Sequence, residues 1–322
     1  MSAARLKVFV ALPLTVEQLA PLSAYDVVLR EGRGPVKPDE LIQALIGASG
    51  HLGPATLLVP NEAIDAAPKL RVISNFGVGF DNVDLAHATK RGIKVTNTPG
   101  VLNDAVADLT LGLILQLARG LGEAQAAVRE GRWVRGGAGL PLGADLKGKT
   151  LAIIGMGRIG CEVAARAQAF GMRVIYHDVR PDCPLPEGAA RVEFADALRQ
   201  ADFLTLHTNL TADSTHLIGA SELAAMKPEA YLVNTARGPI VDQRALCEAV
   251  KGGRIAGAAL DVLEEEPPSP DDPLLSLPNV IITPHIGSAT RETRDAMGRL
   301  AVQNLLDCLE GRPCPNVVNV LA

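Results

Sequence analysis

Cysteine is scarce in this chain. Five residues are scattered among 322, without a Cys-x-x-Cys pair or another spacing typical of metal ligands. This distribution favours reduced thiols over a disulfide framework, so we expect a cytoplasmic protein without a metal site. A large surplus of one charge is also missing, because the formal net charge is -5 and no block rich in lysine and arginine occurs. We therefore expect neither nucleic acid nor a membrane as a partner.

Long hydrophobic runs are missing as well. The apolar run Val8 to Leu14 is short and contains Pro13, which favours a first β-strand over a signal peptide. The most apolar helical stretch, Ala105 to Ala118, is interrupted by Asp108 and is too short and too polar to cross a bilayer. These features indicate a soluble globular protein, and 322 residues suffice for two domains.

A glycine-rich turn lies in the middle of the chain. The apolar run Leu151 to Ile154 leads into a G-x-G-x-x-G segment, Gly155 to Gly160. Its first two glycines permit a tight turn and let a pyrophosphate approach the backbone, and the third lets the following helix lie close to the strand. A second strand, Arg173 to His177, leads to Asp178, 18 residues after Gly160, where a ribose-binding carboxylate belongs. Together these features predict a bound dinucleotide.

Strand and helix patterns alternate on both sides of this turn. We therefore predict an α/β fold with two βα domains, the second a dinucleotide-binding sheet of six strands. A final helix, about Arg291 to Glu310, follows the six strands of the second domain and is not needed by that domain. It is expected to return to the first domain, which would make the first domain discontinuous. The expected strands are Lys7–Ala11, Ile42–Gly47, Arg71–Ser74 and Lys94–Asn97 in the first domain, and Leu151–Ile154, Arg173–His177, Phe203–His207, Tyr231–Asn234, Ile255–Ala259 and Val280–Thr283 in the second; helices are expected over Leu85–Lys90 and from Asn103 to Arg119, continuing to Glu130.

Polar side chains after the later strands are candidates for chemistry, because ligands of open α/β sheets bind beyond the carboxyl ends of the strands. The planar guanidinium of Arg237 suits a carboxylate with an adjacent carbonyl oxygen. His285 can act as a general acid, and Glu266 beside it would favour the protonated imidazolium. Taken singly, each residue has a structural alternative. Arg237 could form a surface salt bridge, His285 could be a structural histidine, and Glu266 could belong to a solvated acidic face. Together they indicate an anion clamp beside a carboxylate–histidine pair, as hydride transfer requires.

A second constellation, Asn75 to Asn82, lies in the first domain. Its glycines follow an expected strand and expose successive backbone N–H groups, an arrangement that binds an anion without a charged side chain. An ordinary turn before a helix is the alternative interpretation.

These segments together resemble the D-isomer-specific 2-hydroxyacid dehydrogenases. The resemblance covers nearly the whole chain, and the number and order of the motifs make it specific. It is carried by Asn75–Asp81, Thr96–Leu102, Ala105–Asp108, Gly155–Gly160, Asn234–Gly238, Ala259–Val262 with Glu266 and Pro267, and Thr283–Gly287.

The resemblance implies a particular domain arrangement. A Rossmann NAD(P)-binding domain, residues 102–285, would be inserted into a flavodoxin-like substrate domain made of residues 1–101 and 286–322. The segment from about 119 to 147 is similar to the family's dimerisation arm, so a homodimer is expected, with Trp133 reaching the partner's active site.

The resemblance also implies roles for single residues. His285 would be the acid/base, Glu266 would hold it, and Arg237 would orient a 2-oxo acid. The substrate would be bound by Leu52, Val78, Gly79 and Arg237, and the loop Ala48–Gly53 would set its size. The cofactor would be bound by Val106, Gly155, Gly157, Arg158, Ile159, Gly160, Asp178, His207, Thr208, Thr235, Ala236, Asp261, His285 and Gly287.

Within the family, Asn75–Gly79 and Gly131–Trp133 look closest to the glyoxylate/hydroxypyruvate reductase branch. The expected reaction is NAD(P)H-dependent reduction of a small 2-oxo acid to the D-2-hydroxy acid. An aryl-pyruvate or 2-ketogluconate reductase and a non-enzymatic NAD-sensing co-repressor are the alternatives. Asp178 would bind the ribose hydroxyls and repel a 2′-phosphate, which favours NAD. NADP is the alternative cofactor, because Arg180 follows and relatives of this branch use NADP with an arginine nearby.

Overall fold

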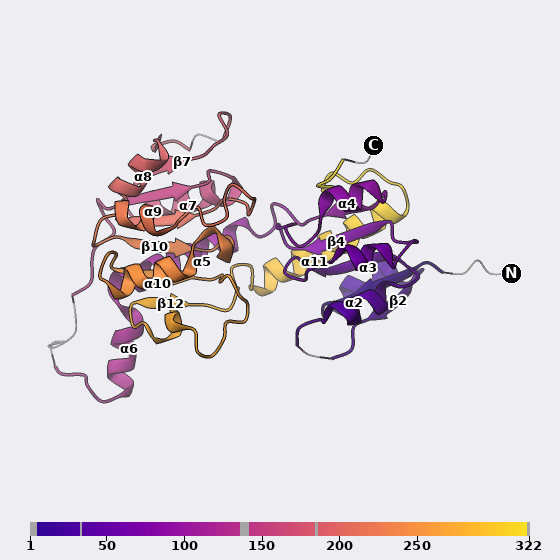
Figure 1. Ribbon diagram of the computed structural model, residues 1–322, viewed down its shortest axis with the longest axis horizontal. Helices are drawn as coiled ribbons and strands as arrows, with labels where there is room; N and C mark the ends of the chain where they lie inside the picture. Colours follow the sequence, from indigo (N-terminus) through magenta and orange to yellow (C-terminus); the bar gives the residue numbers. More distant parts are fainter. Residues whose placement is uncertain (1–4, 33, 136–141, 184–185, 321–322) are drawn as a thin grey trace. The chain divides into compact units, whose positions relative to one another are not determined.

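The computed structural model describes residues 5–32, 34–135, 142–183 and 186–320 (Figure 1). The chain divides into two compact units. Unit 1 comprises Met1–Leu102 and Ala289–Ala322, and unit 2 comprises Asn103–Ser288. Each unit contains one parallel sheet with helices, so the predicted α/β fold with two βα domains is confirmed. The divisions fall at 102/103 and 288/289, against the expected 101/102 and 285/286.

Unit 1 is built on a five-stranded parallel sheet in the order β2-β1-β3-β4-β5. This is the doubly wound order of flavodoxin-like folds. Helix α11 lies near the end of the sequence but packs on β3 and β4, where Ser74 donates a hydrogen bond of 2.8 Å to the carbonyl of Ala301. The elements are β1 (Lys7–Val10), α1 (Val16–Leu19), β2 (Asp26–Leu29), α2 (Pro38–Leu45), β3 (Ala48–Pro54), α3 (Asn61–Asp65), β4 (Val72–Phe76), α4 (Leu85–Lys90), β5 (Lys94–Thr96) and α11 (Arg291–Leu309), with a 3₁₀ turn at Ala20–Leu22.

The region around residue 45 is where the sequence prediction for unit 1 was wrong. The expected strand Ile42–Gly47 belongs largely to helix α2, which begins at Pro38 and buries Leu41 and Leu45 one turn apart. The expected substrate-size loop Ala48–Gly53 is the central strand β3. Leu52 is fully buried within it, so its side chain is not available to a ligand. Strand β2 was not predicted.

Glycine within β3 explains why this strand was missed. A Cβ atom on Gly50 would lie 2.9 Å from Cδ1 of Leu305, so a side chain there would collide with helix α11. The strand therefore carries small residues where a helix packs closely, and it lacks the β-branched run by which strands are recognised.

His51 is a buried imidazole in the middle of β3. Its ring stacks on Phe9 with centroids 5.6 Å apart, and within the described residues its Nδ1 atom has no hydrogen-bond partner. Burial lowers the pKa of His51 from 6.5 to about 4, an effect that a hydrogen bond with the backbone of Phe9 offsets only in part. The histidine is therefore neutral in the folded unit near neutral pH.

We expect unit 1 to lose stability as the pH falls below 6.5. The unfolded chain protonates His51 near pH 6.5, but the folded unit does so only near pH 4. Between these values only the unfolded state gains a proton, so the free energy of unfolding falls progressively, by up to about 3 kcal/mol. Urea unfolding followed by circular dichroism at several pH values measures this change. His51→Phe should flatten the dependence, and an equally steep dependence in that variant would contradict the assignment.

Unit 2 is built on a seven-stranded parallel sheet in the order β12-β11-β10-β9-β6-β7-β8. The order reverses between β6 and β9, as in Rossmann folds, and ligands bind at such a switch point. The six predicted strands are present within one or two residues, and β8 was not predicted. The elements are α5 (Asn103–Arg119), α6 (Leu121–Arg129), β6 (Thr150–Ile154), α7 (Arg158–Ala169), β7 (Arg173–His177), β8 (Ala189–Arg191), α8 (Phe194–Gln200), β9 (Phe203–Leu206), α9 (Ala220–Ala225), β10 (Tyr231–Asn234), α10 (Gln243–Lys251), β11 (Gly257–Leu260) and β12 (Val280–Ile282), with 3₁₀ turns at Gly238–Ile240 and Pro273–Ser276.

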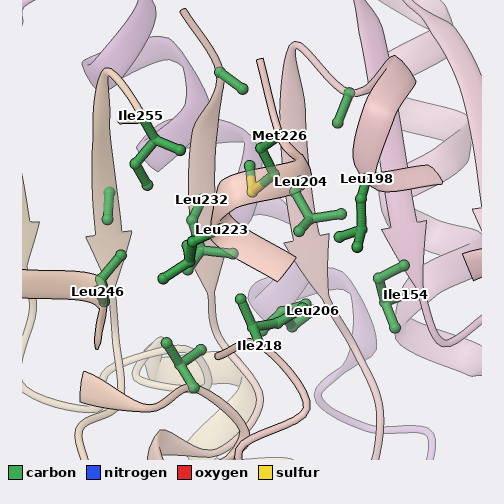
Figure 2. Close-up of a cluster of buried hydrophobic side chains, with 14 of the residues drawn as sticks. Ile154, Leu198, Leu204, Leu206, Ile218, Leu223, Met226, Leu232, Leu246 and Ile255 are labelled. Carbon is green, nitrogen blue, oxygen red and sulfur yellow. The ribbon is translucent and has the colours of Figure 1, made fainter. Parts of the chain in front are cut away.

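Apolar layers cover both faces of this sheet. On one face, Leu198 of α8, Leu223 of α9 and Leu246 of α10 pack with strand residues such as Leu204 and Leu232, as Figure 2 shows. On the other face, α5 and α7 pack against β6, β7 and β9. A strand buried on both sides reads as a continuous apolar run, which is why these strands were recognisable in the sequence.

Helix α5 does not continue to Glu130 as predicted. Gly120 adopts a left-handed conformation (φ 56°) and starts α6 in a new direction, because glycine reaches this region without steric cost. In the described chain no single helix is long and apolar enough to cross a membrane. Helices α5 and α6 meet that criterion only as a pair, which is bent by 63°.

Candidate active site

The three glycines between β6 and α7 lie in three different environments. Gly155 has φ +95°, and a Cβ atom there would lie 2.6 Å from the carbonyl oxygen of His207. At Gly160 a Cβ atom would overlap the carbonyl oxygen of Gly155, so the helix needs glycine to approach the strand. No atom lies within 4 Å of a Cβ built on Gly157. This open side of the backbone, at the N-terminus of the 12-residue helix α7, suits the phosphates of a dinucleotide.

Asp178 follows β7 and is already saturated with donors. Its Oδ1 accepts hydrogen bonds from the backbone N–H and Nε of Arg180, and its Oδ2 accepts them from Met156 N and Arg180 Nη2, all within 3.1 Å. Burial alone would raise the pKa of Asp178, but the Arg180 guanidinium and the two backbone donors lower it to about 2. The predicted ribose carboxylate is therefore ionised and paired with an arginine whose side chain is half exposed.

His285 and Glu266 form a hydrogen-bonded pair in unit 2. The imidazole Nδ1 donates to Oε2 of Glu266 over 2.7 Å, and both side chains are about one-third exposed. Burial would raise the pKa of Glu266, but the imidazole of His285, the N–H of Leu263 and the charge of Arg237 lower it. Glu266 is therefore a carboxylate, and the other ring nitrogen of His285 is left to exchange a proton with a ligand.

The backbone of His285 is held in a conformation that is rare outside glycine. Its φ is 52°, and its N–H donates to the carbonyls of Asp261 and Thr283. The buried carboxylate of Asp261 accepts hydrogen bonds from the Thr283 hydroxyl and from the N–H groups of Ile286 and Gly287. Asp261 was predicted to contact the cofactor, and the structure adds that it fixes the loop that carries His285.

Arg237 is placed by a tight contact between two loops. A Cβ atom on Gly238 would overlap the carbonyl of Leu263, so only glycine lets the loop after β10 lie against the loop after β11. Leu263 in turn donates its N–H to Oε1 of Glu266 over 3.1 Å. Asn234 closes the Arg237 turn by donating to the Arg237 carbonyl. Unit 2 thus brings Arg237, Glu266 and His285 together at the carboxyl end of its sheet.

The predicted anion-binding segment of unit 1 is a turn after β4, here called the glycine loop (residues 77–80). Val78 O accepts a hydrogen bond of 2.7 Å from Asn97, and Gly79 O accepts one of 3.2 Å from Asn75. In the part of the chain that the structure describes, no acceptor bonds the N–H groups of Val78 and Gly79. These N–H groups are available to an anionic ligand.

Comparison with known proteins shows the family of this chain. The model of the D-isomer specific 2-hydroxyacid dehydrogenase NAD-binding domain matches residues 111–287. The chain belongs to this dehydrogenase family. A glyoxylate reductase from Thermococcus litoralis is 49% identical over 267 residues, which cover 81% of this chain and 80% of that protein.

Solved structures give the same result for this dehydrogenase. The TT0316 protein from Thermus thermophilus matches with a TM-score of 0.90 and 46% identity, over 97% of this chain and all of that one. An NADPH-dependent glyoxylate/hydroxypyruvate reductase from Sinorhizobium meliloti, in complex with NADP and malonate, matches with a TM-score of 0.87 and 37% identity. That match covers 98% of this chain and 97% of the other.

The dehydrogenase uses NAD(P), and unit 2 fits the cofactor. The remaining predicted cofactor residues gather around the same end of the sheet. Thr235 shares a hydrogen bond of 3.0 Å with Thr110 of α5, a residue that sequence reasoning missed, and Thr110 also bonds the carbonyl of Val106. A Cβ on Gly287 would be 3.4 Å from Val106. Arg158 and Ile159 open helix α7, Thr208 follows His207 after β9, and Ala236 precedes Arg237.

His207 is neutral in this dehydrogenase. Burial lowers its pKa to about 3, and its Nε2 shares a hydrogen bond of 2.9 Å with Thr205. The five cysteines are unpaired, and the described residues contain no group of three or more His, Cys, Asp or Glu side chains that could hold a metal ion.

Proposed function

We propose that the protein reduces a small 2-oxo acid of the glyoxylate or hydroxypyruvate type to the D-2-hydroxy acid. The observation that carries this proposal is the His285–Glu266 pair beside Arg237 in the unit that binds NAD(P). Glyoxylate reductases with 43–49% identity support the choice of a small substrate. The reduced nicotinamide supplies the hydride when the cofactor is bound.

Each residue of the site has one task in this proposal. Glu266 accepts a hydrogen bond from Nδ1–H of His285, and the proton on Nε2 passes to the carbonyl oxygen as this oxygen becomes an alkoxide, which leaves a neutral imidazole. Arg237 binds the substrate carboxylate and carbonyl with its planar fork. The N–H groups of Val78 and Gly79 bind the carboxylate as well.

A substrate panel tests the proposal. Glyoxylate, hydroxypyruvate, phenylpyruvate and 2-ketogluconate are each supplied with NADH or NADPH, and loss of the reduced nicotinamide absorbance is followed. We expect the highest kcat/KM for glyoxylate or hydroxypyruvate. Preference for a bulky acid would favour the aryl-pyruvate or 2-ketogluconate alternative. Binding of NADH without turnover of any acid would favour a co-repressor. None of the similar proteins described above bears the name of either alternative.

The paired Asp178 and Arg180 predict that both cofactors are accepted. Arg180 forms an ion pair with the Asp178 carboxylate, which would otherwise repel a 2′-phosphate. The exposed guanidinium of Arg180 can also bind that phosphate. Arg180→Ala should free Asp178 and lower kcat/KM for NADPH relative to NADH about tenfold or more, since hydrogen bonds to charged groups contribute about 1.5–3 kcal/mol. Steady-state kinetics with both cofactors measures the ratio.

Arg199→Ala is the control for this prediction. Arg199 pairs with Asp196 on the surface of α8, so its loss removes an arginine–aspartate pair elsewhere in unit 2. The cofactor ratio should then stay at the wild-type value. If Arg180→Ala leaves the ratio unchanged, Arg180 does not govern cofactor choice.

We further infer a homodimer formed through the segment that follows α5. Leu121, Val128 and Trp133 expose about half or more of their surfaces within this one segment, and a group of exposed apolar side chains supports a surface that a partner covers. Residues 136–141 of the predicted arm lie outside the described residues. Sedimentation velocity should give the mass of a dimer, and a monomer at micromolar concentration would contradict the inference.

The unpaired cysteines support the predicted cytoplasmic location.

A further inference from the structure

Three successive carbonyl groups of the glycine loop accept hydrogen bonds from residues of unit 1. The Gly77 carbonyl accepts a hydrogen bond of 2.8 Å from the N–H of Thr98. The Val78 carbonyl accepts one of 2.7 Å from Nδ2 of Asn97, and the Gly79 carbonyl accepts one from Asn75. Two consecutive residues of the segment after β5 therefore hold two consecutive peptide groups of the loop.

The direction of these carbonyls fixes the direction of the N–H groups. In a trans peptide, the C=O of one residue and the N–H of the next point in opposite directions. Holding the carbonyls of residues 77 and 78 thus turns the N–H groups of Val78 and Gly79 away from Thr98 and Asn97, and holding the carbonyl of residue 79 turns the N–H of Phe80 away from Asn75. Such a row of aligned N–H groups is an anion-binding nest, and its geometry depends on the side chains behind it.

Asn97 is itself held by helix α11 and by the segment that follows this helix. Its carbonyl accepts a hydrogen bond of 2.8 Å from Nδ2 of Asn304, and its N–H donates to the carbonyl of Asn316. Asn304 is almost fully buried, and its Oδ1 accepts a hydrogen bond of 2.9 Å from the side chain of Asn316. A buried amide network therefore fixes Asn97, which is only 7% exposed, from behind.

We propose that Asn97 is a positioning residue for substrate binding. It does not touch the substrate; it holds the Val78–Gly79 peptide so that the Gly79 N–H faces the substrate carboxylate. This inference rests on the proposed binding of the 2-oxo acid at the glycine loop. Because the carboxylate is bound alike in the ground state and in the transition state, Asn97 acts on substrate affinity rather than on the chemical step.

The substitution Asn97→Asp tests this role with a side chain of nearly the same size. A carboxylate cannot donate to the Val78 carbonyl, and it repels that oxygen, so the peptide is expected to rotate and the Gly79 N–H is lost. We expect KM for glyoxylate and Kd for the carboxylate inhibitor oxamate to rise together, by about tenfold to a hundredfold. The rate at saturating substrate should change by less than about threefold, and Kd for NADH should stay the same.

Asn319→Asp is the matched control. Asn319 is also 7% exposed, lies in unit 1, and donates to the Ile93 carbonyl and the Thr89 hydroxyl, away from the glycine loop. Both variants lose a buried amide donor, so a merely structural role would lower the melting temperature in both and leave both KM values unchanged. That result, or unchanged oxamate binding in folded Asn97→Asp, would overturn the proposal.

Two further measurements keep the outcome unambiguous. If Asn97→Asp does not fold, Asn75→Asp releases the adjacent Gly79 carbonyl and should raise the oxamate Kd in the same way; an unchanged Kd overturns the proposal. Turnover of glyoxylate by the wild-type enzyme tests the proposed function separately. If the wild type binds oxamate but reduces no 2-oxo acid, the proposed function fails, and the change in oxamate Kd still decides the role of Asn97.

Discussion

His285→Ala is expected to lower kcat by about a thousandfold, with the substrate and cofactor still bound. General acid catalysis by a positioned side chain contributes about a hundredfold to ten-thousandfold. The His285 ring is oriented by the 2.7 Å hydrogen bond between its Nδ1 and Oε2 of Glu266. Stopped-flow measurement of a single turnover with NADH and glyoxylate isolates this effect from product release. Kd for NADH, titrated separately, should stay near the wild-type value.

The protein contains a close control for this variant. His216 also has a positive φ, 53°, and its Nε2 pairs with Oε1 of Glu264 over 3.0 Å. This second histidine–glutamate pair is in the same unit but is more exposed to solvent. His216→Ala should leave kcat near the wild-type value. Equal losses in the two variants would show a general effect of disturbing these loops, and full activity of His285→Ala would remove the histidine from the proton transfer.

The sequence predicted the fold where burial makes a simple pattern. Strands β6, β7 and β9–β11 are covered on both faces, and β12 is partly covered on both, so each reads as an apolar run followed by a polar residue or glycine. Because these strands are parallel, their carboxyl ends meet at one edge, and the polar residues after them could be grouped without coordinates. Arg237, Glu266 and His285 were grouped as candidate site residues in this way.

Contacts between distant segments could not be predicted from local patterns. Strand β3 was mistaken for a loop because it contains Gly50. The glycine is required there by the close packing of Leu305, which lies more than 250 positions away in the sequence. The saturation of Asp178 by Arg180 depends on side-chain geometry that the spacing of two residues does not specify. The proposed role of Asn97 could not be predicted for the same reason, because its partners are Val78, which follows β4, and Asn304 of α11, and only the fold brings these residues together.

The site in unit 2 depends on one continuous series of contacts. Gly238 allows the Arg237 loop to touch Leu263, Leu263 bonds Glu266, and Glu266 bonds His285. The groups proposed to bind the substrate anion and to donate the proton are therefore fixed relative to one another by backbone as well as by side chains. This rigidity favours hydride transfer, because the carboxylate clamp and the acid must meet the same small substrate.

Arg237→Ala is expected to lower kcat/KM for glyoxylate by about a hundredfold to ten-thousandfold. The substrate carboxylate and carbonyl would lose two charge-assisted hydrogen bonds, each contributing about 1.5–3 kcal/mol. Arg237→Lys keeps the charge but not the planar fork, so it should recover only part of this loss. Arg173→Ala is the control, because Arg173 begins β7 at the amino end of the same sheet. Steady-state kinetics with saturating NADH gives kcat/KM for each variant. Near-wild-type kinetics in Arg237→Ala would remove the guanidinium from substrate binding, and full recovery by lysine would show that charge alone suffices.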